Sequence, residues 1–138
     1  MKLPENDFVF GYVARHQPVK NHYGLLKALA EVVKHDSNVK LVLIGKRLSS
    51  KNNALEKTIN QLDIAKHVTL LGERNDIPEL LQVLDVYVSP SHAEAFPNTI
   101  GEAMSCGIPC IATDVGDSAA IIGDTGIVVP PNDNDALA

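Results

Sequence analysis

Short apolar runs alternate along the chain with segments of helical periodicity, and this alternation restricts the possible folds more than any other feature. Continuous apolar runs rich in β-branched residues predict buried strands. They occupy residues 8–14, 39–44, 68–71, 86–89, 109–112 and 126–129. Helical patterns cover residues 23–35, 55–62, 76–84 and 99–106. We therefore predict an α/β fold, a Rossmann-like doubly wound parallel sheet of about six strands with helices on both faces.

Two strand orders are compatible with this pattern. The Rossmann-type order 3-2-1-4-5-6 places the first strand beside the fourth, whereas the flavodoxin order 2-1-3-4-5 places it beside the third. Carboxyl ends of parallel strands meet at one edge of a sheet, and ligands bind there where the strand order reverses. In the Rossmann-type order, residues 15–21 and residues 90–98 would therefore lie side by side.

Composition excludes several classes of protein. The chain has 138 residues, a length typical of one domain, and 45% of them are apolar. Twelve basic and seventeen acidic residues give a net charge of −5 without a basic run, unlike a nucleic-acid-binding protein. No apolar stretch is long enough to span a membrane. The start has no apolar core typical of a signal peptide, so we expect cytoplasmic residence.

The end of the sequence indicates a fragment. Residues 133–138 predict a capped helix that has only begun, and so short a helix is marginal without further chain. We therefore treat residues 1–138 as a single domain of a longer protein, a fragment that lacks the C-terminal helices.

The segment between residues 90 and 104 combines features of a ligand-binding loop that leads into a helix. Pro97 keeps the preceding residue extended, and Asn98 is a favourable N-cap for a helix beginning at Thr99. The first N–H groups of a helix have no partner inside it, so this terminus can bind an anion. Gly101 lies in the first turn, where glycine destabilises a helix, and close approach of a ligand or another backbone would explain it.

Two carboxylates, Glu94 and Glu102, flank this helix start. Acidic residues are common near helix N-termini because the helix dipole favours them, so Glu102 alone is a weak functional signal. Glu94 alone is typical of a solvated loop. Nothing in the sequence fixes the separation of the two carboxylates, so their spacing does not identify an acid–base pair.

Two cations, Arg15 and Lys20, follow the first strand. Each alone is typical of a solvated surface residue. In the Rossmann-type order both lie near the helix start at Asn98 and Thr99, where they would form a diphosphate cradle with charge-assisted hydrogen bonds. Neither a Gly-rich dinucleotide fingerprint nor a P-loop follows the first strand, which disfavours ordinary NAD and ATP sites.

These motifs together resemble the donor-binding half of glycosyltransferase family 4, whose members are retaining enzymes of the GT-B architecture. The resemblance covers nearly the whole chain. It rests on Arg15-x4-Lys20, Val42-Leu-Ile-Gly45, Pro90-Ser-x-x-Glu94, Glu94-x7-Glu102, Glu102-Ala-Met-x-x-Gly-x-Pro109 and Ala112-Thr-Asp-Val-Gly116.

The resemblance implies a set of roles. Arg15 and Lys20 would bind the diphosphate of a UDP-sugar or another nucleotide-sugar, Glu94 would face hydroxyls of the donor sugar, and Glu102 would bind the ribose. Arg15, Lys20 and Glu94 would be the catalytic residues. Further contacts, mainly from backbone N–H groups, would come from Ala95, Phe96, Asn98, Thr99 and Ile100. No metal and no cofactor would be needed, because the cations and the helix terminus stabilise the leaving diphosphate.

The resemblance also implies what this chain lacks and where it departs from the family. GT-B catalysis uses a cleft between two halves, so the missing N-terminal acceptor-binding domain would be a partner within the same polypeptide. We expect this fragment to bind a nucleotide-sugar weakly and to transfer nothing. Residues 117–120, which we expect to form a loop, replace a common Gly-x-Pro-Glu pattern, so no role is transferred to Ala120.

Alternatives remain open for the intact protein. It can be a hexosyltransferase acting on a glycan or lipid-linked acceptor, a nucleotide-sugar 2-epimerase of the same architecture, or a non-catalytic nucleotide-binding module. No nucleic-acid partner is expected, and peripheral contact with the inner membrane face is left open.

Other residue types add little. The histidines lack the spacing of zinc ligands, although His16 and His92 belong to the two loops. We expect Cys106 and Cys110 to be buried thiols. We also expect the aromatic residues of the first strand to be core residues; they are Phe8, Phe10 and Tyr12.

Overall fold

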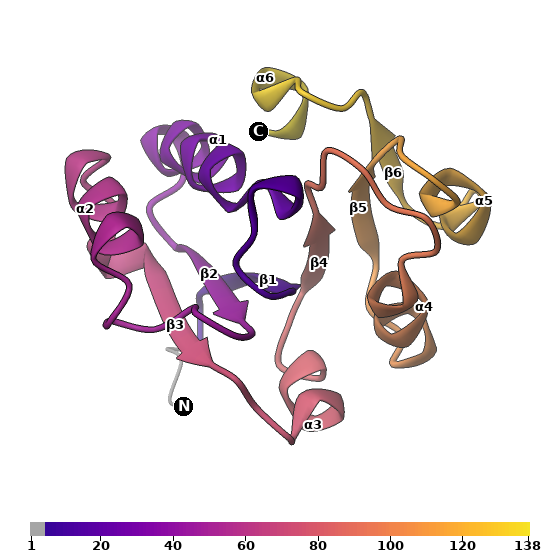
Figure 1. Ribbon diagram of the computed structural model, residues 1–138, viewed down its shortest axis with the longest axis horizontal. Helices are drawn as coiled ribbons and strands as arrows, with labels where there is room; N and C mark the ends of the chain where they lie inside the picture. The colour runs from indigo at the N-terminus through magenta and orange to yellow at the C-terminus, as the bar shows by residue number, and fades with distance from the viewer. Residues whose placement is uncertain (1–4) are drawn as a thin grey trace.

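The computed structural model describes residues 5–138 and has one parallel sheet between two layers of helices (Figure 1). The strands are β1 (Phe8–Val13), β2 (Val39–Ile44), β3 (Val68–Gly72), β4 (Val86–Ser89), β5 (Cys110–Thr113) and β6 (Ile127–Val129). The helices are α1 (His22–His35), α2 (Asn53–Gln61), α3 (Ile77–Leu81), α4 (Asn98–Ser105), α5 (Ser118–Ile122) and α6 (Asn134–Leu137). Short 3₁₀ turns occur at Pro18–Lys20 and Ala65–His67. Residues 1–4 lie outside the described residues, and they belong to the start of the chain for which no signal peptide is expected.

The sheet has the order β3-β2-β1-β4-β5-β6, and every adjacent pair of strands is parallel. This is the Rossmann-type order, so the predicted fold class is confirmed and the flavodoxin order is excluded. The reversal lies between β1 and β4, where Phe10 and Gly11 pair with Val86 and Tyr87.

Helices cover both faces of the sheet, as the apolar strands predict. Figure 1 shows α1, α2 and α6 on one face and α4 and α5 on the other. Residues 41–44 of β2 are completely buried between the two layers. From α1, the side chains of Leu25, Leu26 and Leu29 pack into this core, as their spacing predicts. No helix within residues 5–138 has both the length and the apolar character needed to cross a membrane.

Two expectations about elements are wrong. Residues 117–120 are not a loop, since Ser118 begins α5, a helix too short to show periodicity in the sequence. The third helix ends at Leu81, so Leu84 lies in the turn before β4. Leu84 is nevertheless buried, because its side chain packs over Gly11. Any residue larger than glycine at position 11 would overlap the Leu84 side chain.

One core prediction is also wrong. Phe8, the first residue of β1, is 44% exposed, and its ring packs edge-on against Phe10. Tyr12 is buried as expected, at the carboxyl end of the same strand.

Candidate functional site

The loops that follow β1 and β4 are hydrogen-bonded to each other. The His92 N–H donates to the Val19 carbonyl (2.8 Å), and the Asn21 amide donates to the Pro90 carbonyl (3.1 Å). Asn21 adopts a left-handed backbone conformation (φ 55°) and also caps α1 by accepting from the Gly24 N–H. The predicted convergence of the two loops is therefore present in the structure.

A groove of about 390 Å³ lies between these loops and the start of α4. Its lining comes from both sides of the sheet reversal, which is where α/β folds bind ligands. Val19 and Phe96 are apolar side chains on its rim that are 38% and 62% exposed. The lining residues are Tyr12, Val13, Ala14, Arg15, Gln17, Val19, Lys20, Glu94, Phe96, Pro97, Asn98 and Thr99.

One of the two predicted cations of this groove is paired with one of the two predicted carboxylates. Lys20 Nζ lies 2.6 Å from Glu94 Oε1, and the two side chains are only 23% and 13% exposed. Arg15, by contrast, is exposed and forms no ion pair with any acid within residues 5–138. Because Lys20 and Glu94 neutralise one another, Arg15 supplies the uncompensated positive charge of the groove.

The start of α4 differs by one residue from the expectation. Asn98 is the first helical residue and Pro97 occupies the N-cap position, so Asn98 does not cap the helix. The Ile100 N–H donates to the Pro97 carbonyl (3.2 Å), and this bond replaces a side-chain cap. The Asn98 and Thr99 N–H groups donate to no acceptor within residues 5–138 and line the groove through their residues. This terminus can therefore accept an anion.

Not every predicted donor-site residue lines the groove. Glu102 is exposed on α4 and Ile100 is buried in the core, with its N–H already engaged. The Ala95 carbonyl accepts from the Asp117 N–H (3.1 Å), which ties this loop to the start of α5. At Gly101 no atom lies within 4 Å of where a Cβ would be, so close approach of another backbone does not explain this glycine.

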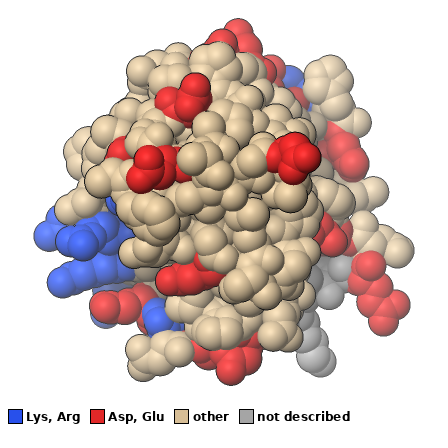
Figure 2. Space-filling view, turned by 90° about the vertical axis from the view of Figure 1, so that its right-hand side faces the viewer, with Lys and Arg blue, Asp and Glu red and all other residues tan. Residues whose placement is uncertain are grey.

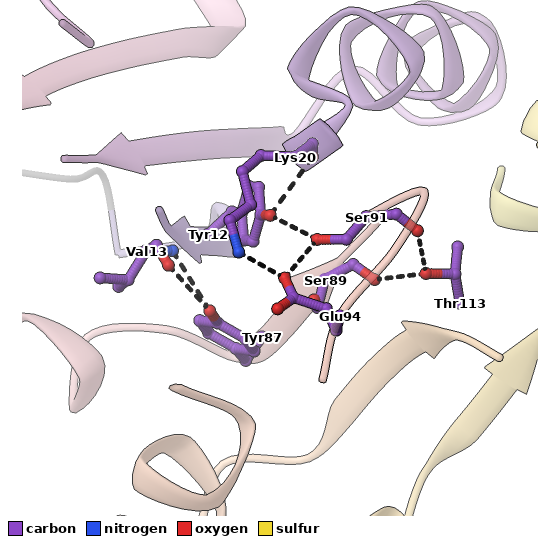
Figure 3. A network of polar contacts seen from close by, with 8 residues as sticks. All are labelled: Tyr12, Val13, Lys20, Tyr87, Ser89, Ser91, Glu94 and Thr113. Carbon is purple, nitrogen blue, oxygen red and sulfur yellow. Dashed lines mark hydrogen bonds and ion pairs between the residues drawn. The ribbon is translucent and has the colours of Figure 1, made fainter. Parts of the chain in front are cut away.

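A buried polar network lies beneath the groove, and the sequence did not predict it (Figure 3). The Tyr12 hydroxyl lies 3.0 Å from Ser91 Oγ and 3.2 Å from the Lys20 carbonyl. Ser91 Oγ donates to Glu94 Oε1 (2.8 Å), and Thr113 Oγ1 donates to the Ser91 carbonyl (2.6 Å). Burial raises the pKa of Tyr12 well above its usual value, so its hydroxyl stays protonated and able to donate.

A second buried tyrosine fixes the end of β1. The Tyr87 hydroxyl from β4 donates to the Val13 carbonyl (3.3 Å) and lies 3.4 Å from the Val13 N–H. Complete burial raises the pKa of Tyr87 strongly, which keeps it neutral. The two tyrosine rings pack edge-on with centroids 6.2 Å apart.

Two glycines permit the close approaches that shape the groove. Gly116 has φ 51°, and a Cβ there would overlap the carbonyl oxygens of Glu94 and Ala95. Gly45, at the end of β2, has φ 148°, and a Cβ there would overlap the carbonyl of Ala14. Both glycines belong to motifs noted in the sequence, and backbone contact with the site loops is their physical reason.

A histidine pair lies behind the loop that carries Arg15 and Lys20. His22 is buried, neither ring nitrogen has a hydrogen-bond partner within residues 5–138, and its ring packs against Tyr12 (5.1 Å) and His16 (5.2 Å). Burial, with smaller contributions from the nearby positive groups, lowers the pKa of His22 to about 4. His22 is therefore neutral at physiological pH.

A second hollow, of about 540 Å³, adjoins the first at the carboxyl ends of β1 and β2. Its side chains are His16, Arg47, Ser49, Lys51 and Asn52, which include cations and no acid. Asn52 caps α2 through its Oδ1 (3.2 Å to the Leu55 N–H), while its amide donates to the Arg47 carbonyl and to His16 Nδ1. An amide nitrogen can only donate, so His16 Nδ1 is unprotonated. Burial, followed by the charge of Arg47, lowers the pKa of His16.

Basic side chains also gather along one margin of the molecule when it is viewed from the α4 and α5 side (Figure 2). Acidic side chains are scattered over the rest of that view.

Cys110 is buried, and desolvation raises the pKa of its thiol to about 11, whereas Cys106 is only half-buried. No three His, Cys, Asp or Glu side chains within residues 5–138 are grouped so that they could hold a metal ion.

Comparison with known proteins identifies the family. A family model described as glycosyl transferases group 1 matches residues 1–138. The chain belongs to the group 1 glycosyl transferases. The family predicted from the motifs is thereby confirmed.

Individual proteins named as glycosyltransferases align along nearly the whole chain. An Escherichia coli protein named UDP-Gal:alpha-D-GlcNAc-diphosphoundecaprenol alpha-1,3-galactosyltransferase is 32% identical over 98% of the chain and 36% of its own length. The Staphylococcus aureus capsular polysaccharide biosynthesis glycosyltransferase CapM is 32% identical over 99% of the chain and 36% of its length. The chain thus spans about a third of the length of these relatives.

The fold of this group 1 glycosyl transferase domain also matches solved structures. Anabaena HepE, crystallised with UDP and glucose, superposes with a TM-score of 0.87 and 32% sequence identity over 96% of the chain and 37% of HepE. HepE has also been solved with UDP-glucose, again with a TM-score of 0.87.

Proposed function

We propose that this chain is the nucleotide-sugar-binding domain of a retaining glycosyltransferase, which transfers a hexosyl unit to a glycan or lipid-linked acceptor. The observation that supports this most directly is the meeting of Arg15, Lys20, Glu94 and the open start of α4 in one groove. The UDP and UDP-glucose bound to HepE support a nucleotide diphosphate and its sugar as the ligand.

The groove offers complementary partners for each part of such a donor. Arg15 and the Asn98 and Thr99 N–H groups can bind the diphosphate, because anions are favoured beside cations and helix N-termini. Glu94 suits hydroxyl groups rather than phosphate, because two anions would repel one another. Lys20 lies between these regions and can contact both the carboxylate and the phosphate nearest the sugar.

The same groups would assist the reaction. Departure of a nucleoside diphosphate builds negative charge on the phosphate next to the sugar. Fixed cations and N–H groups aimed at that phosphate stabilise the charge as it develops, without reorganisation of solvent. We propose that Arg15, Lys20 and the α4 terminus have this role, and that the transfer uses no metal.

The remaining parts of the proposal concern the intact protein. We propose that an acceptor-binding domain of the same polypeptide forms the opposite wall of the cleft, over Val19 and Phe96. Transfer would then require both domains, and the present domain alone would bind its donor without transferring the sugar. We propose that the intact enzyme lies in the cytoplasm, and that it contacts the inner membrane face if its acceptor is lipid-linked.

Calorimetric titration tests the donor assignment. UDP, GDP and ADP and their common sugar conjugates are titrated into the wild-type chain and into Arg15→Ala/Lys20→Ala. The double variant should lose at least about 100-fold in affinity, because two charge-assisted hydrogen bonds are removed.

A charge-matched control removes two exposed lysines from other helices, Lys27→Ala/Lys57→Ala. This control should keep its affinity within about twofold, since its cations lie outside the groove. The proposal is wrong if no nucleoside diphosphate binds the wild type, or if the double variant binds as the control does.

A further inference from the structure

Glu94 is held by only one of its two carboxylate oxygens. Oε1 accepts from Lys20 Nζ (2.6 Å) and from Ser91 Oγ (2.8 Å), and two donors satisfy one carboxylate oxygen. Oε2 has no hydrogen-bond partner within residues 5–138. Figure 3 shows both donors meeting at a single oxygen. The second oxygen of Glu94 is therefore available to a ligand in the groove.

Counting protons gives the network a direction. The single proton of the Ser91 hydroxyl is donated to Glu94, so Ser91 Oγ must accept from the Tyr12 hydroxyl 3.0 Å away. Tyr12 has one proton and two acceptors within reach, Ser91 Oγ (3.0 Å) and the Lys20 carbonyl (3.2 Å). A buried tyrosine thus supports both groups that contact Glu94, the serine through its side chain and the lysine through its backbone.

The backbone below this network is also restrained. Thr113 on β5 donates to the Ser91 carbonyl, and Ser91 itself is completely buried. Gly116 lets the next loop pack directly on the Glu94 carbonyl. The loop that carries Glu94 is therefore tied to β1 on one side and to β5 on the other.

We propose that Ser91 and Tyr12 are positioning residues that fix Glu94 through Oε1 and direct Oε2 toward a hydroxyl of the donor sugar. This inference rests on the proposed function, in which Glu94 faces the sugar. It adds two residues to the donor site that act on the donor through Glu94.

The need for a second donor follows from the chemistry of the ion pair. A lysine ammonium is a compact charge on a flexible stem, so it fixes how near Glu94 comes but not how the carboxylate is turned. A buried serine hydroxyl has a defined direction, because it is held from below by Tyr12. Together the two donors immobilise Glu94 before the donor arrives, and this lowers the entropic cost of binding the sugar.

The test separates the sugar from the nucleotide. UDP and UDP-glucose, or GDP and GDP-mannose if the guanine nucleotide binds more tightly, are titrated into wild type, Ser91→Ala, Tyr12→Phe and Glu94→Ala. Ser91→Ala should weaken the sugar nucleotide by about threefold to tenfold, corresponding to one hydrogen bond, and leave the bare diphosphate within about twofold. Tyr12→Phe should act in the same direction with a smaller effect.

A double-mutant cycle shows whether Ser91 acts through Glu94. In the Glu94→Ala background, Ser91→Ala should cause no further loss of sugar-nucleotide affinity, because the side chain it orients is gone. Additive losses would mean that Ser91 affects the groove by another route and would overturn the inference.

The chain offers matched controls for both truncations. Ser118 is also a fully buried serine, but its hydroxyl has no partner within residues 5–138, so Ser118→Ala should leave both affinities unchanged. Tyr23→Phe removes the hydroxyl of a half-buried tyrosine outside the network and should do the same. Thermal unfolding of each variant shows whether it is folded.

Failure of this inference can be told from failure of the proposed function. If the wild type binds neither nucleotide nor sugar nucleotide, the proposed function is wrong. If it binds both and Ser91→Ala keeps their affinity ratio, only the positioning role is wrong. Crystal structures of the unliganded wild type and Ser91→Ala test the role without any ligand, since Glu94 must turn when Ser91 is truncated. An unchanged carboxylate would contradict the proposal.

Discussion

Two hollows share the carboxyl edge of the sheet, and they are built in different ways. In the groove between β1 and β4, charges of opposite sign are paired, and Lys20 and Glu94 are connected to buried hydroxyls. In the hollow between β1 and β2, Arg47 and Lys51 are exposed and have no acidic partner within residues 5–138. The two regions meet at Arg15, which lines the groove and a smaller pocket beside Lys46 and Arg47.

The difference separates two uses of charge. Paired and buried groups have fixed directions, so they can select a ligand by the position of its hydroxyls. Exposed cations of like sign attract anions over a longer range, but salt screens them. We therefore expect the β1–β4 groove to determine which donor binds, and the β1–β2 hollow to affect mainly how strongly an anion is attracted.

The largest effect is expected from Gly116→Ala, which acts on the groove alone. The new methyl group would overlap the Glu94 and Ala95 carbonyls, and alanine is strained at φ 51°. We expect a loss of about 3–5 kcal/mol in the free energy of unfolding, from strain and overpacking together. Urea unfolding measures it, and sugar-nucleotide binding should fall as Glu94 is displaced.

Gly107→Ala is the control for this substitution. Gly107 also has a positive φ (76°), but no atom lies within 4 Å of where a Cβ would be. It should lose only the conformational part, about 1 kcal/mol, and keep its nucleotide affinity. Equal losses at the two positions would show that contact with the Glu94 loop contributes nothing.

A pH-dependent loss of stability is expected from His22, which lies between the two hollows. Its pKa is about 4 in the folded chain and about 6.5 when unfolded, so the unfolded state binds more protons between these values. Stability from this residue is complete above pH 6.5 and falls as the pH is lowered to 4, by about 3 kcal/mol in all. His22→Phe should remove that part of the acid sensitivity. At pH 7, where the imidazole is neutral, it should cost only what the larger phenyl ring adds by overpacking, about 1–3 kcal/mol.

Urea unfolding of wild type and His22→Phe from pH 4 to 8 measures the difference between the two curves. His35→Gln, a substitution at an exposed histidine at the other end of α1, should keep the wild-type curve. Parallel curves for wild type and His22→Phe would mean that His22 is not held neutral by its surroundings.

The sequence predicted the fold and part of the groove. The apolar runs predicted the parallel sheet but left two strand orders open, and the family resemblance carried by the motifs of Arg15, Lys20 and Glu94 favoured the Rossmann-type order. Their pairing could not be predicted, because spacing along the chain does not determine which atoms meet. Tyr12 has the pattern of a core residue, and its hydroxyl becomes informative only when Ser91 is seen opposite it. The short helix α5 escaped prediction because five residues cannot show a helical period.

A moderate effect is expected from Asn52→Ala, which acts on the hollow. Asn52 caps α2 and binds the Arg47 carbonyl, where Arg47 has a left-handed backbone (φ 66°). We expect a loss of about 1–2 kcal/mol, typical of a removed N-cap. Asn53→Ala, at the exposed next position, should stay within about 0.5 kcal/mol of wild type in the same urea titration. If Asn52→Ala also changed the ratio of sugar-nucleotide to nucleotide affinity, the division between the two regions would be wrong.

The smallest effect, and the most direct comparison of the two regions, is expected from Lys46→Gln/Arg47→Gln. Both side chains are exposed beside Arg15, so they should strengthen diphosphate binding only through their field. We expect the double variant to bind UDP about twofold to threefold more weakly at low salt, and like the wild type at about 0.5 M salt, where the Debye length is a few ångströms. Arg15→Ala should instead keep most of its defect at high salt, because a direct charge-assisted hydrogen bond is lost. Titrations of both variants across a salt series compare the two slopes. A salt-resistant defect in Lys46→Gln/Arg47→Gln would mean that the β1–β2 hollow contacts the ligand directly, and the donor site would then extend across both regions.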